Sequence, residues 1–275
     1  MEKTQQKRLI IIGIYVLIFL LVIYGFYSKF KPQPSCFDGK QNQNEQGVDC
    51  GGVCAQKCAI VAEKNLVVEQ ASFVASGVGN NFDLFAVVTN PNQTLGSSKF
   101  NYQFTVKNAA GETMGTQSGS SFILPGETKY VVESNLSLRD VPVKVELSIT
   151  NPEWVEANEF YEKPQLKVVN KNYAPISNGV GFSEATGLLK NESSLSFATI
   201  KVEIILKNAQ GEVVALNSTQ MNTVQTGENR DFRVFWPNRF PGEVANMEVQ
   251  SEVNVFASDA FVKKNFKPAK FQESN

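Results

Sequence analysis

The sequence predicts a mainly β protein: an N-terminal transmembrane helix, a short disulfide-rich module and two tandem antiparallel β-sandwiches. Three observations lead to this prediction. Residues 9–27 form an uncharged apolar run, all four cysteines lie between residues 36 and 58, and the remaining chain repeats its own turn motifs at an offset of about 100 residues. We expect a cytoplasmic N-terminus over residues 1–8, a helix over 9–27, a linker over 28–35, the module over 36–58, sandwiches over 62–156 and 164–257, and a tail over 258–275.

The apolar run over residues 9–27 has the length of a membrane span. A helix of this length extends roughly 28 Å, close to the hydrocarbon thickness of a bilayer. A cleaved signal peptide is the alternative, but it needs a shorter apolar region and a small-residue cleavage site, which residues 25–28 do not clearly offer. Residues 9–27 therefore predict a membrane contact through a retained single-pass anchor.

Flanking charges favour a cytoplasmic N-terminus only slightly. Lys3, Lys7 and Arg8 precede the apolar run, whereas Lys29 and Lys31 follow it. The cysteines that follow are the stronger argument, because disulfides persist outside the cytosol. We expect the cell membrane as location, with the bulk of the chain extracytoplasmic.

Cys36, Cys50, Cys54 and Cys58 have the spacing C-x13-C-x3-C-x3-C. Zinc sites usually use two separate C-x2-4-C pairs, but here the two C-x3-C pairs share Cys54. Two disulfides in an oxidising compartment fit this spacing better than a zinc site. The sequence does not determine which cysteines pair.

Oxygen-bearing side chains between the first two cysteines offer a calcium hypothesis. The candidate ligands are Asp38, Asn42, Glu45 and Asp49, because calcium prefers carboxylate and amide oxygens on a flexible loop. Their spacing does not match an EF-hand, and a polar turn solvated by its own side chains is the preferred interpretation. No other cofactor is expected.

Residues 36–58 resemble a short module of secreted and surface proteins, with the pattern C-x-D-G-x-x-N-x-x-E-x-G-x-D-C-G-G-x-C-x-x-x-C. The resemblance implies an extracytoplasmic address, and it implies no activity.

Beyond residue 58 the chain has the pattern of strands and turns. Apolar and polar residues alternate over residues 66–74, 82–88, 100–106, 130–132 and 141–149, which is typical of half-buried antiparallel strands. No segment beyond residue 27 keeps a helical period. The segment 107–115 (KNAAGETMG) returns as 207–215 (KNAQGEVVA), and the order of several such matches indicates two copies of one domain.

The repeated K-N-A-x-G-E motif predicts a turn between two strands. Asn108 and Asn208 are expected to tolerate the left-handed backbone region, and Gly111 and Gly211 to provide a position without Cβ. These residues are assigned to turn structure and not to catalysis.

The order of strands and turn motifs is similar to that of small immunoglobulin-like sandwiches of the FxLYD type, which occur in bacterial cell-envelope proteins. The literal F-x-L-Y-D string is absent, and residues 82–85 (FDLF) match it only in part. The resemblance implies anchored modules without catalysis. We also expect Trp154 and Trp236 to cap the two cores, and the tail with its lysines to be a solvated terminus.

The composition argues against most chemistry. The chain has no histidine and a net charge of -1, and it carries no recognised catalytic or nucleotide-binding motif. We therefore expect no catalytic residues, no nucleic acid and no small-molecule substrate. Four glycosylation sequons, at Asn92, Asn135, Asn191 and Asn217, matter only in a host that glycosylates.

The predicted function is that of a non-catalytic, membrane-anchored protein of the cell envelope whose sandwiches bind an envelope or surface protein. Two alternatives stay open. The chain could be an accessory subunit of a membrane machine for secretion, division or pilus assembly, or a calcium-dependent surface or carbohydrate binder.

Overall fold

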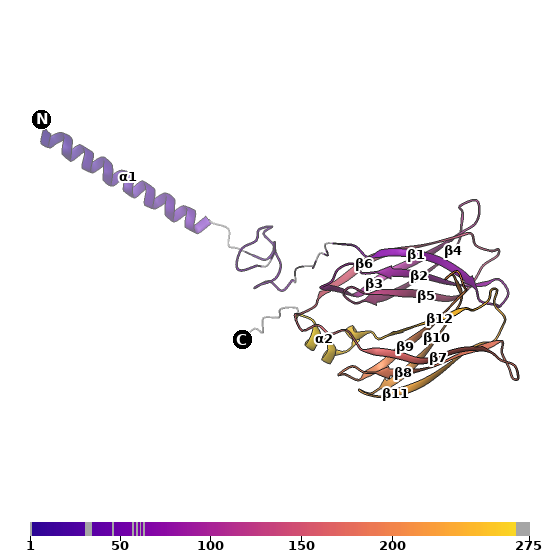
Figure 1. Ribbon diagram of the computed structural model, residues 1–275. Coiled ribbons are helices and arrows are strands. Elements are labelled where there is room, and N and C mark those ends of the chain that lie inside the picture. The colour runs from indigo at the N-terminus through magenta and orange to yellow at the C-terminus, as the bar shows by residue number, and fades with distance from the viewer. Residues whose placement is uncertain are drawn as a thin grey trace. The chain divides into compact units, whose positions relative to one another are not determined.

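The computed structural model describes residues 2–30, 35–45, 47–56, 58, 60, 62 and 64–267. It divides into two units, residues 1–58 with the last seven residues, and Ala59–Pro268. The mainly β fold with an N-terminal apolar helix and two disulfides confirms the predicted fold class (Figure 1).

Helix α1 spans Glu2–Phe30, and its window Ile12–Lys29 is long and apolar enough to cross a membrane. The large apolar side chains from Ile12 to Tyr27 are exposed on all sides of the helix. A helix that packs on the surface of a globular domain has one polar face toward water, and α1 has no such face between Ile12 and Tyr27.

Each half of the second unit contains six antiparallel strands in two three-stranded sheets. The first half comprises β1 (Val67–Ala75), β2 (Asn81–Thr89), β3 (Leu95–Lys107), β4 (Thr113–Ile123), β5 (Thr128–Ser137) and β6 (Lys144–Glu156). The second comprises β7 (Leu166–Pro175), β8 (Ser183–Asn191), β9 (Phe197–Lys207), β10 (Val213–Val224), β11 (Asn229–Trp236) and β12 (Asn246–Glu252). The sheet orders β1-β2-β5 and β4-β3-β6 recur as β7-β8-β11 and β10-β9-β12. The two halves therefore share one topology.

Each sandwich buries its own apolar core between its two sheets. Phe100, Phe104 and Ile123 are fully buried in the first, and Ile200, Ile204 and Leu206 in the second. A third cluster of Val74, Phe85, Ile205 and Leu216 joins the outward faces of β1, β2, β9 and β10. The two sandwiches are thus packed against each other through apolar side chains.

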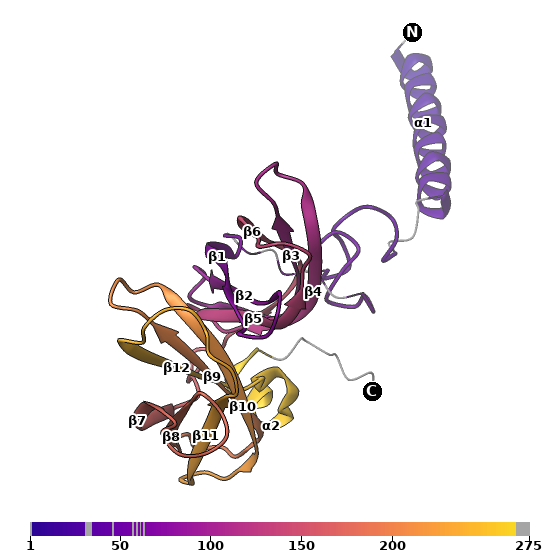
Figure 2. The ribbon, with the colours of Figure 1, turned by 90° about the vertical axis from the view of Figure 1, so that its right-hand side faces the viewer.

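Because each sandwich has an even number of antiparallel strands, the chain enters and leaves the sandwiches at one end, which we call the base. The backbone of Lys64 exchanges two hydrogen bonds with the side-chain amide of Asn92 in the β2–β3 loop. The N–H of Lys267 donates to the carbonyl of Glu156 (2.9 Å) at the end of β6. The opposite end, which we call the loop end, carries the six loops that connect odd-numbered to even-numbered strands (Figures 1 and 2).

The expectation of a solvated tail is wrong for residues 258–267. Helix η1 (Val255–Ala257) and helix α2 (Asp259–Asn265) follow β12. Phe261 and Phe266 are 3% and 1% exposed and belong to the second core, and Ala157 pairs with Phe266. Burial of these two rings outweighs the solvation of the neighbouring lysines, which lie on the other side of this short helix.

The two tryptophans differ. Trp236 is 5% exposed in the second core, and its Nε1 donates to the carbonyl of Leu216 (3.1 Å). Trp154 is half-buried on β6 and belongs to neither core cluster. The prediction of a core tryptophan therefore holds for Trp236 alone.

Candidate functional site

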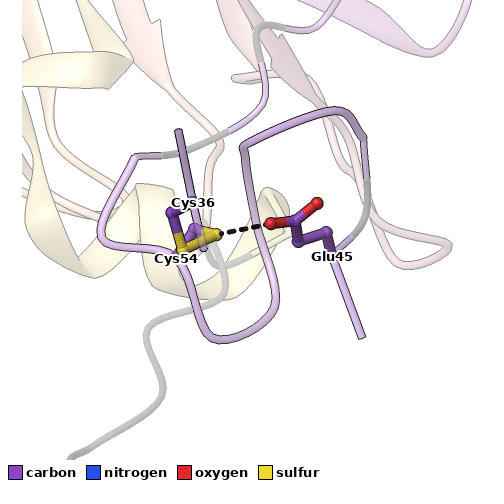
Figure 3. Close-up of side chains that lie close together, drawn as sticks. All are labelled: Cys36, Glu45 and Cys54. Atoms are coloured by element: carbon purple, nitrogen blue, oxygen red, sulfur yellow. Dashed lines mark hydrogen bonds between the residues drawn. A yellow bond between two sulfur atoms is a disulfide. The ribbon is translucent and has the colours of Figure 1, made fainter. Parts of the chain in front are cut away.

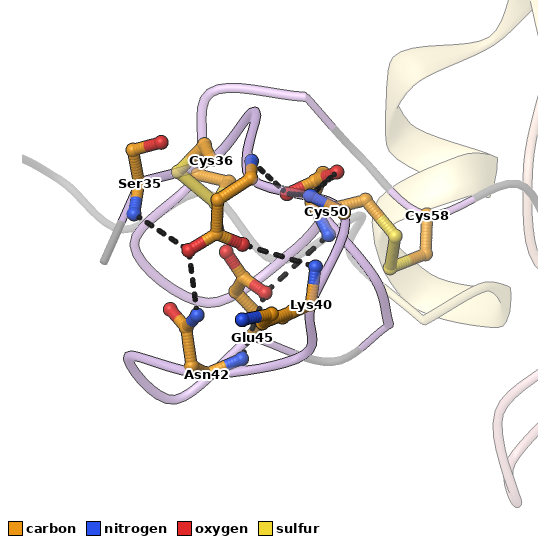
Figure 4. The surroundings of a disulfide bond; sticks show 11 residues. Ser35, Cys36, Lys40, Asn42, Glu45, Cys50 and Cys58 are labelled. Atoms are coloured by element: carbon orange, nitrogen blue, oxygen red, sulfur yellow. Dashed lines mark hydrogen bonds between the residues drawn. A yellow bond between two sulfur atoms is a disulfide. The ribbon is translucent and has the colours of Figure 1, made fainter. Parts of the chain in front are cut away.

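The disulfide module is held by two bridges, Cys36–Cys54 and Cys50–Cys58 (Figure 4). The first bridge joins residues 18 positions apart and the second joins residues eight positions apart, so together they constrain the loops between residues 36 and 58. All four cysteines are paired, which leaves no thiolate for a zinc ion among them. This confirms the predicted disulfides.

The proposed calcium ligands lie in one loop of this module. The three carboxylates already accept hydrogen bonds, whereas the side-chain oxygen of Asn42 is buried without a partner among the described residues. Asp49 accepts the backbone N–H groups of Asp38 and Gly39 (both 2.9 Å), and Glu45 Oε2 accepts those of Asn42 and Asp49 (3.0 and 3.3 Å). Asp38 accepts the Asn42 side-chain amide (2.9 Å), which lowers the pKa of Asp38 (Figure 4). These contacts are those of a polar turn that closes on its own backbone.

Glu45 also lies against the first disulfide. Its side chain is 7% exposed, and Oε1 lies 3.2 Å from Cys54 Sγ (Figure 3). A sulfur in a disulfide carries no hydrogen, so this is a close contact and not a donated hydrogen bond. For the same reason the grouping of Cys36, Glu45 and Cys54 offers a metal ion only one ligand.

The two K-N-A-x-G-E motifs form identical hairpin connections. In each, the Asn side-chain oxygen accepts the N–H of the following Glu, Glu112 or Glu212, at 2.9 Å, and the Asn amide donates to that carboxylate. Gly111 and Gly211 adopt φ values of 80° and 83°.

The expectation that Asn108 and Asn208 adopt the left-handed region is wrong. Neither is among the residues with positive φ, because the asparagine acts through its side chain, which closes the turn like a backbone group. Only the glycine needs the special conformation.

A cleft lies between the two sandwiches. Its volume is about 370 Å³. The first sandwich contributes Ser121, Phe122 and Tyr130, and the second contributes Lys201, Glu203 and Glu252. Because both sandwiches supply walls, the cleft exists only when they are packed together.

Charged residues lie in and beside this cleft in opposed pairs. Lys129 is 2% exposed and contacts Glu252 at 2.5 Å, with its ammonium 4.1 Å from the centre of the Phe122 ring. Lys201 contacts Glu203, which is 3% exposed, at 2.6 Å. Each buried charge thus has a partner, as burial requires.

The environment shifts the pKa values of both members of the second pair. Burial raises the pKa of Glu203, although the Lys201 ammonium works against this shift. Burial acts to lower the pKa of Lys201, but the carboxylate of Glu203 outweighs it and the pKa is raised.

Polar contacts tie the sandwiches together around the cleft. The N–H of Tyr130 donates to Gln250 Oε1 (2.8 Å), and Gln250 Nε2 donates to Glu203 Oε2 (3.1 Å). Within the first sandwich, the Tyr102 hydroxyl donates to Glu133 Oε1 (2.7 Å), and burial raises the pKa of this tyrosine. The cleft is therefore a fixed, hydrogen-bonded surface.

The cleft does not present an activated nucleophile among its described residues. Lys129 Nζ donates to the Ser121 hydroxyl (3.2 Å), which is the one serine–lysine contact at the cleft. A lysine base must have a free lone pair to accept the hydroxyl proton, and an ammonium that is paired with Glu252 has none. This contact supports packing and does not support hydrolysis.

The cleft was missed in the sequence because its residues come from both repeats, and they include core residues such as Tyr102 and Val131 as well as outward-facing ones such as Tyr130. Alternation predicts which way a residue points within one sandwich, but not where two sandwiches meet. Glu203, which lies among the apolar residues of 200–206, was the available signal, since charged residues are rarely buried without a partner.

Two asparagines at matching repeat positions were also missed as structural residues. Asn90 and Asn191 are 1% and 0% exposed, and each amide donates to backbone carbonyls of two loops at the base. Asn191 and Asn92, which is 8% exposed, are two of the four sequons, and their amides are engaged in the folded protein.

Comparisons with known proteins find only distant structural similarities. No family model matches the sequence, and no curated protein matches it. Among solved structures the chain is similar to red sea bream transglutaminase at 13% identity and a TM-score of 0.20, over 67% of this chain and 31% of that one. It is also similar to the calcium-binding domain CBD12 of CALX1.1, at 13% identity and a TM-score of 0.19, over 66% and 79%.

The chain spans less than a third of the transglutaminase chain, at 31%. At these TM-scores the similarities carry no argument about fold, activity or calcium. The FxLYD type and the named cysteine module stay predictions from the sequence.

Proposed function

We propose that this chain is a single-pass, membrane-anchored extracytoplasmic protein of the cell envelope, without catalytic activity, whose two joined sandwiches bind a protein partner. The apolar helix α1 supplies the anchor, and the paired cysteines fit an oxidising compartment outside the cytosol. The fixed contacts between the sandwiches make them a single binding body.

One observation carries the proposed binding role: the loop end exposes apolar side chains. Val180 is 96% exposed, Val141 66%, Val143 63% and Val78 46%, and they lie in three loops of the loop end. The β1–β2 and β5–β6 loops are bonded to each other, because the amide of Asn80 donates to the carbonyl of Arg139 (2.9 Å). Exposed apolar side chains on fixed loops are typical of protein-binding surfaces.

Photocrosslinking in intact cells tests this proposal. A photoreactive amino acid is placed at Val180 or Val141 at the loop end. The matched control is Phe160 at the base, which is also apolar and 73% exposed. We expect a crosslinked partner from the two loop positions and none from Phe160. A partner captured at Phe160 alone, or at no position, would refute a loop-end binding surface.

A second experiment tests the topology and the role of α1. Thiol labelling of intact and permeabilised cells should find residues 36–58 disulfide-bonded and outside the cytoplasm. Replacing residues 9–27 with an unrelated apolar helix should leave the loop-end crosslinks intact. Their loss would favour the alternative of an accessory subunit whose helix packs on other membrane helices.

A further inference from the structure

The four three-stranded sheets have eight edge strands, and six of these are protected by charge. Edge strands offer unpaired N–H and C=O groups, and natural proteins protect them with charged residues or proline. The protecting charges include Glu69 in β1, Glu133 in β5, Glu146 in β6, Lys167 in β7, Asp231 in β11 and Glu248 in β12. Strands β4 and β10 contain neither a charged residue nor a proline.

Strand β10 is covered instead by side chains of β11. Trp236 Nε1 donates to the carbonyl of Leu216 (3.1 Å) near one end of β10. Arg230 donates to the carbonyls of Asn222 and Thr223 (2.6 and 3.1 Å) near the other end. The outer edge of β10 is therefore occupied within its own sandwich.

Strand β4 has only half of this cover. Lys129, the counterpart of Arg230 in the repeat, donates to the carbonyl of Phe122 (3.1 Å). The counterpart of Trp236 in the strand register is Leu136, which pairs with Phe82 as Trp236 pairs with Ser183, and a leucine side chain has no N–H to donate to an edge carbonyl. Among the described interactions, no side chain bonds the backbone of residues 113–121. Most of an 11-residue edge is left without cover or charge.

The open stretch of β4 is complementary to itself. Thr116, Ser118 and Ser120 are exposed and alternate along one face of the strand, with Gln117 and Gly119 between them. In an antiparallel pair centred on Ser118, Thr116 faces Ser120 and Gln117 faces Gly119. Hydroxyl pairs of this kind are favourable across strands, and no charge meets its own copy.

We propose that two copies of this chain associate through antiparallel pairing of their β4 edges, so that the sheets β4-β3-β6 join into one continuous sheet. The occupant of this edge is a second copy because Thr116 then faces Ser120 across the pair, Ser118 faces its own copy, and the strand carries no charge that a copy of itself would repel. The pairing uses a different surface from the loop end, so it stands independently of the proposed partner.

Cysteine crosslinking of the purified full chain in lipid nanodiscs or detergent tests the pairing and its register. All four native cysteines are in disulfides, so an introduced thiol is unique. Ser118→Cys should shift under mild oxidation from 30.4 kDa to twice that mass. The matched control Ser218→Cys is an exposed serine on the covered edge β10, and it should stay at the monomer mass.

A charge variant provides the second measurement. Ser118→Lys places a lysine opposite its own copy and should remove the dimer seen by light scattering, whereas Ser218→Lys should leave it unchanged. A monomeric native chain at all concentrations, or a dimer that Ser118→Lys does not affect, would overturn the proposal. So would crosslinking of Ser118→Cys in cells to a different protein by a chain that is monomeric when pure.

Discussion

Replacement of Asn191 by alanine should destabilise the protein far more than its position in a loop suggests. The side chain is 0% exposed, and its amide donates to the carbonyls of Leu195 and Gln225 (both 3.0 Å). Its oxygen accepts the N–H of Ser193 (3.1 Å). Alanine leaves these three backbone groups without their partner.

The expected loss follows from this count. Leaving a buried polar group without a partner costs about 1–3 kcal/mol, so three groups predict a loss of roughly 3–6 kcal/mol after the loops relax. Such a loss is a large share of a typical unfolding free energy of about 5–15 kcal/mol. With a urea m-value near 2 kcal/mol/M, the unfolding midpoint should fall by about 1.5–3 M.

Urea unfolding of the full chain measures this loss. Fluorescence of Trp236, which is 5% exposed in the same sandwich, reports the transition. The control is Asn208→Ala, whose bonds to Glu212 lie in an exposed turn where water can replace them, so it should cost about 1 kcal/mol or less. Equal losses for the two variants would refute the reasoning that burial makes Asn191 essential.

Three further outcomes follow from the cleft and the module. Lys129→Met should cost about 3–5 kcal/mol in thermal unfolding, because it leaves Glu252 buried without its cation, and the added change Glu252→Leu should recover most of the loss. A double variant as unstable as the single one would contradict this. Since the pKa of Glu203 is raised in the folded state, the folded protein binds more protons, and its stability should fall as the pH rises above 4.5 toward the folded pKa. Glu203→Gln should remove that part of the slope, and an unchanged pH profile would exclude Glu203 as its source. A chelator should leave the thermal midpoint unchanged, because the oxygens of Asp38, Glu45 and Asp49 already accept N–H groups, and stabilisation by added calcium would show a bound ion.

Local sequence signals predicted the parts of the fold that local chemistry determines. The alternation over residues 82–88 and 100–106 lies within β2 (Asn81–Thr89) and β3 (Leu95–Lys107). The repeated turn motif lies at the β3–β4 and β9–β10 connections, because Gly111 and Gly211 supply the positive φ that these turns need. Strand β6 begins at Lys144 and not at residue 141, since Pro142 has no N–H to donate to a neighbouring strand.

Features that depend on distant residues could not be predicted in this way. The pairing of four cysteines has three solutions, and spacing does not choose between them. Helix α2 was missed because its lysines look like a solvated tail, and only the position of the second core shows that Phe261 and Phe266 have a place to be buried. Asn90 and Asn191 occupy matching positions of the two repeats, but a repeat shows that a residue recurs and not which carbonyls it will bond.

The even number of strands in each sandwich limits how such a protein can grow. A copy added by duplication starts and ends at the base, so it lies beside its neighbour and does not extend beyond it. The reach from base to loop end is set by one strand, about 40 Å for the 13 residues of β3, however many copies the gene contains. Duplication therefore widens the array of loops at constant height. The connection between helix α1 and the sandwiches can become longer only through the stretch before residue 64.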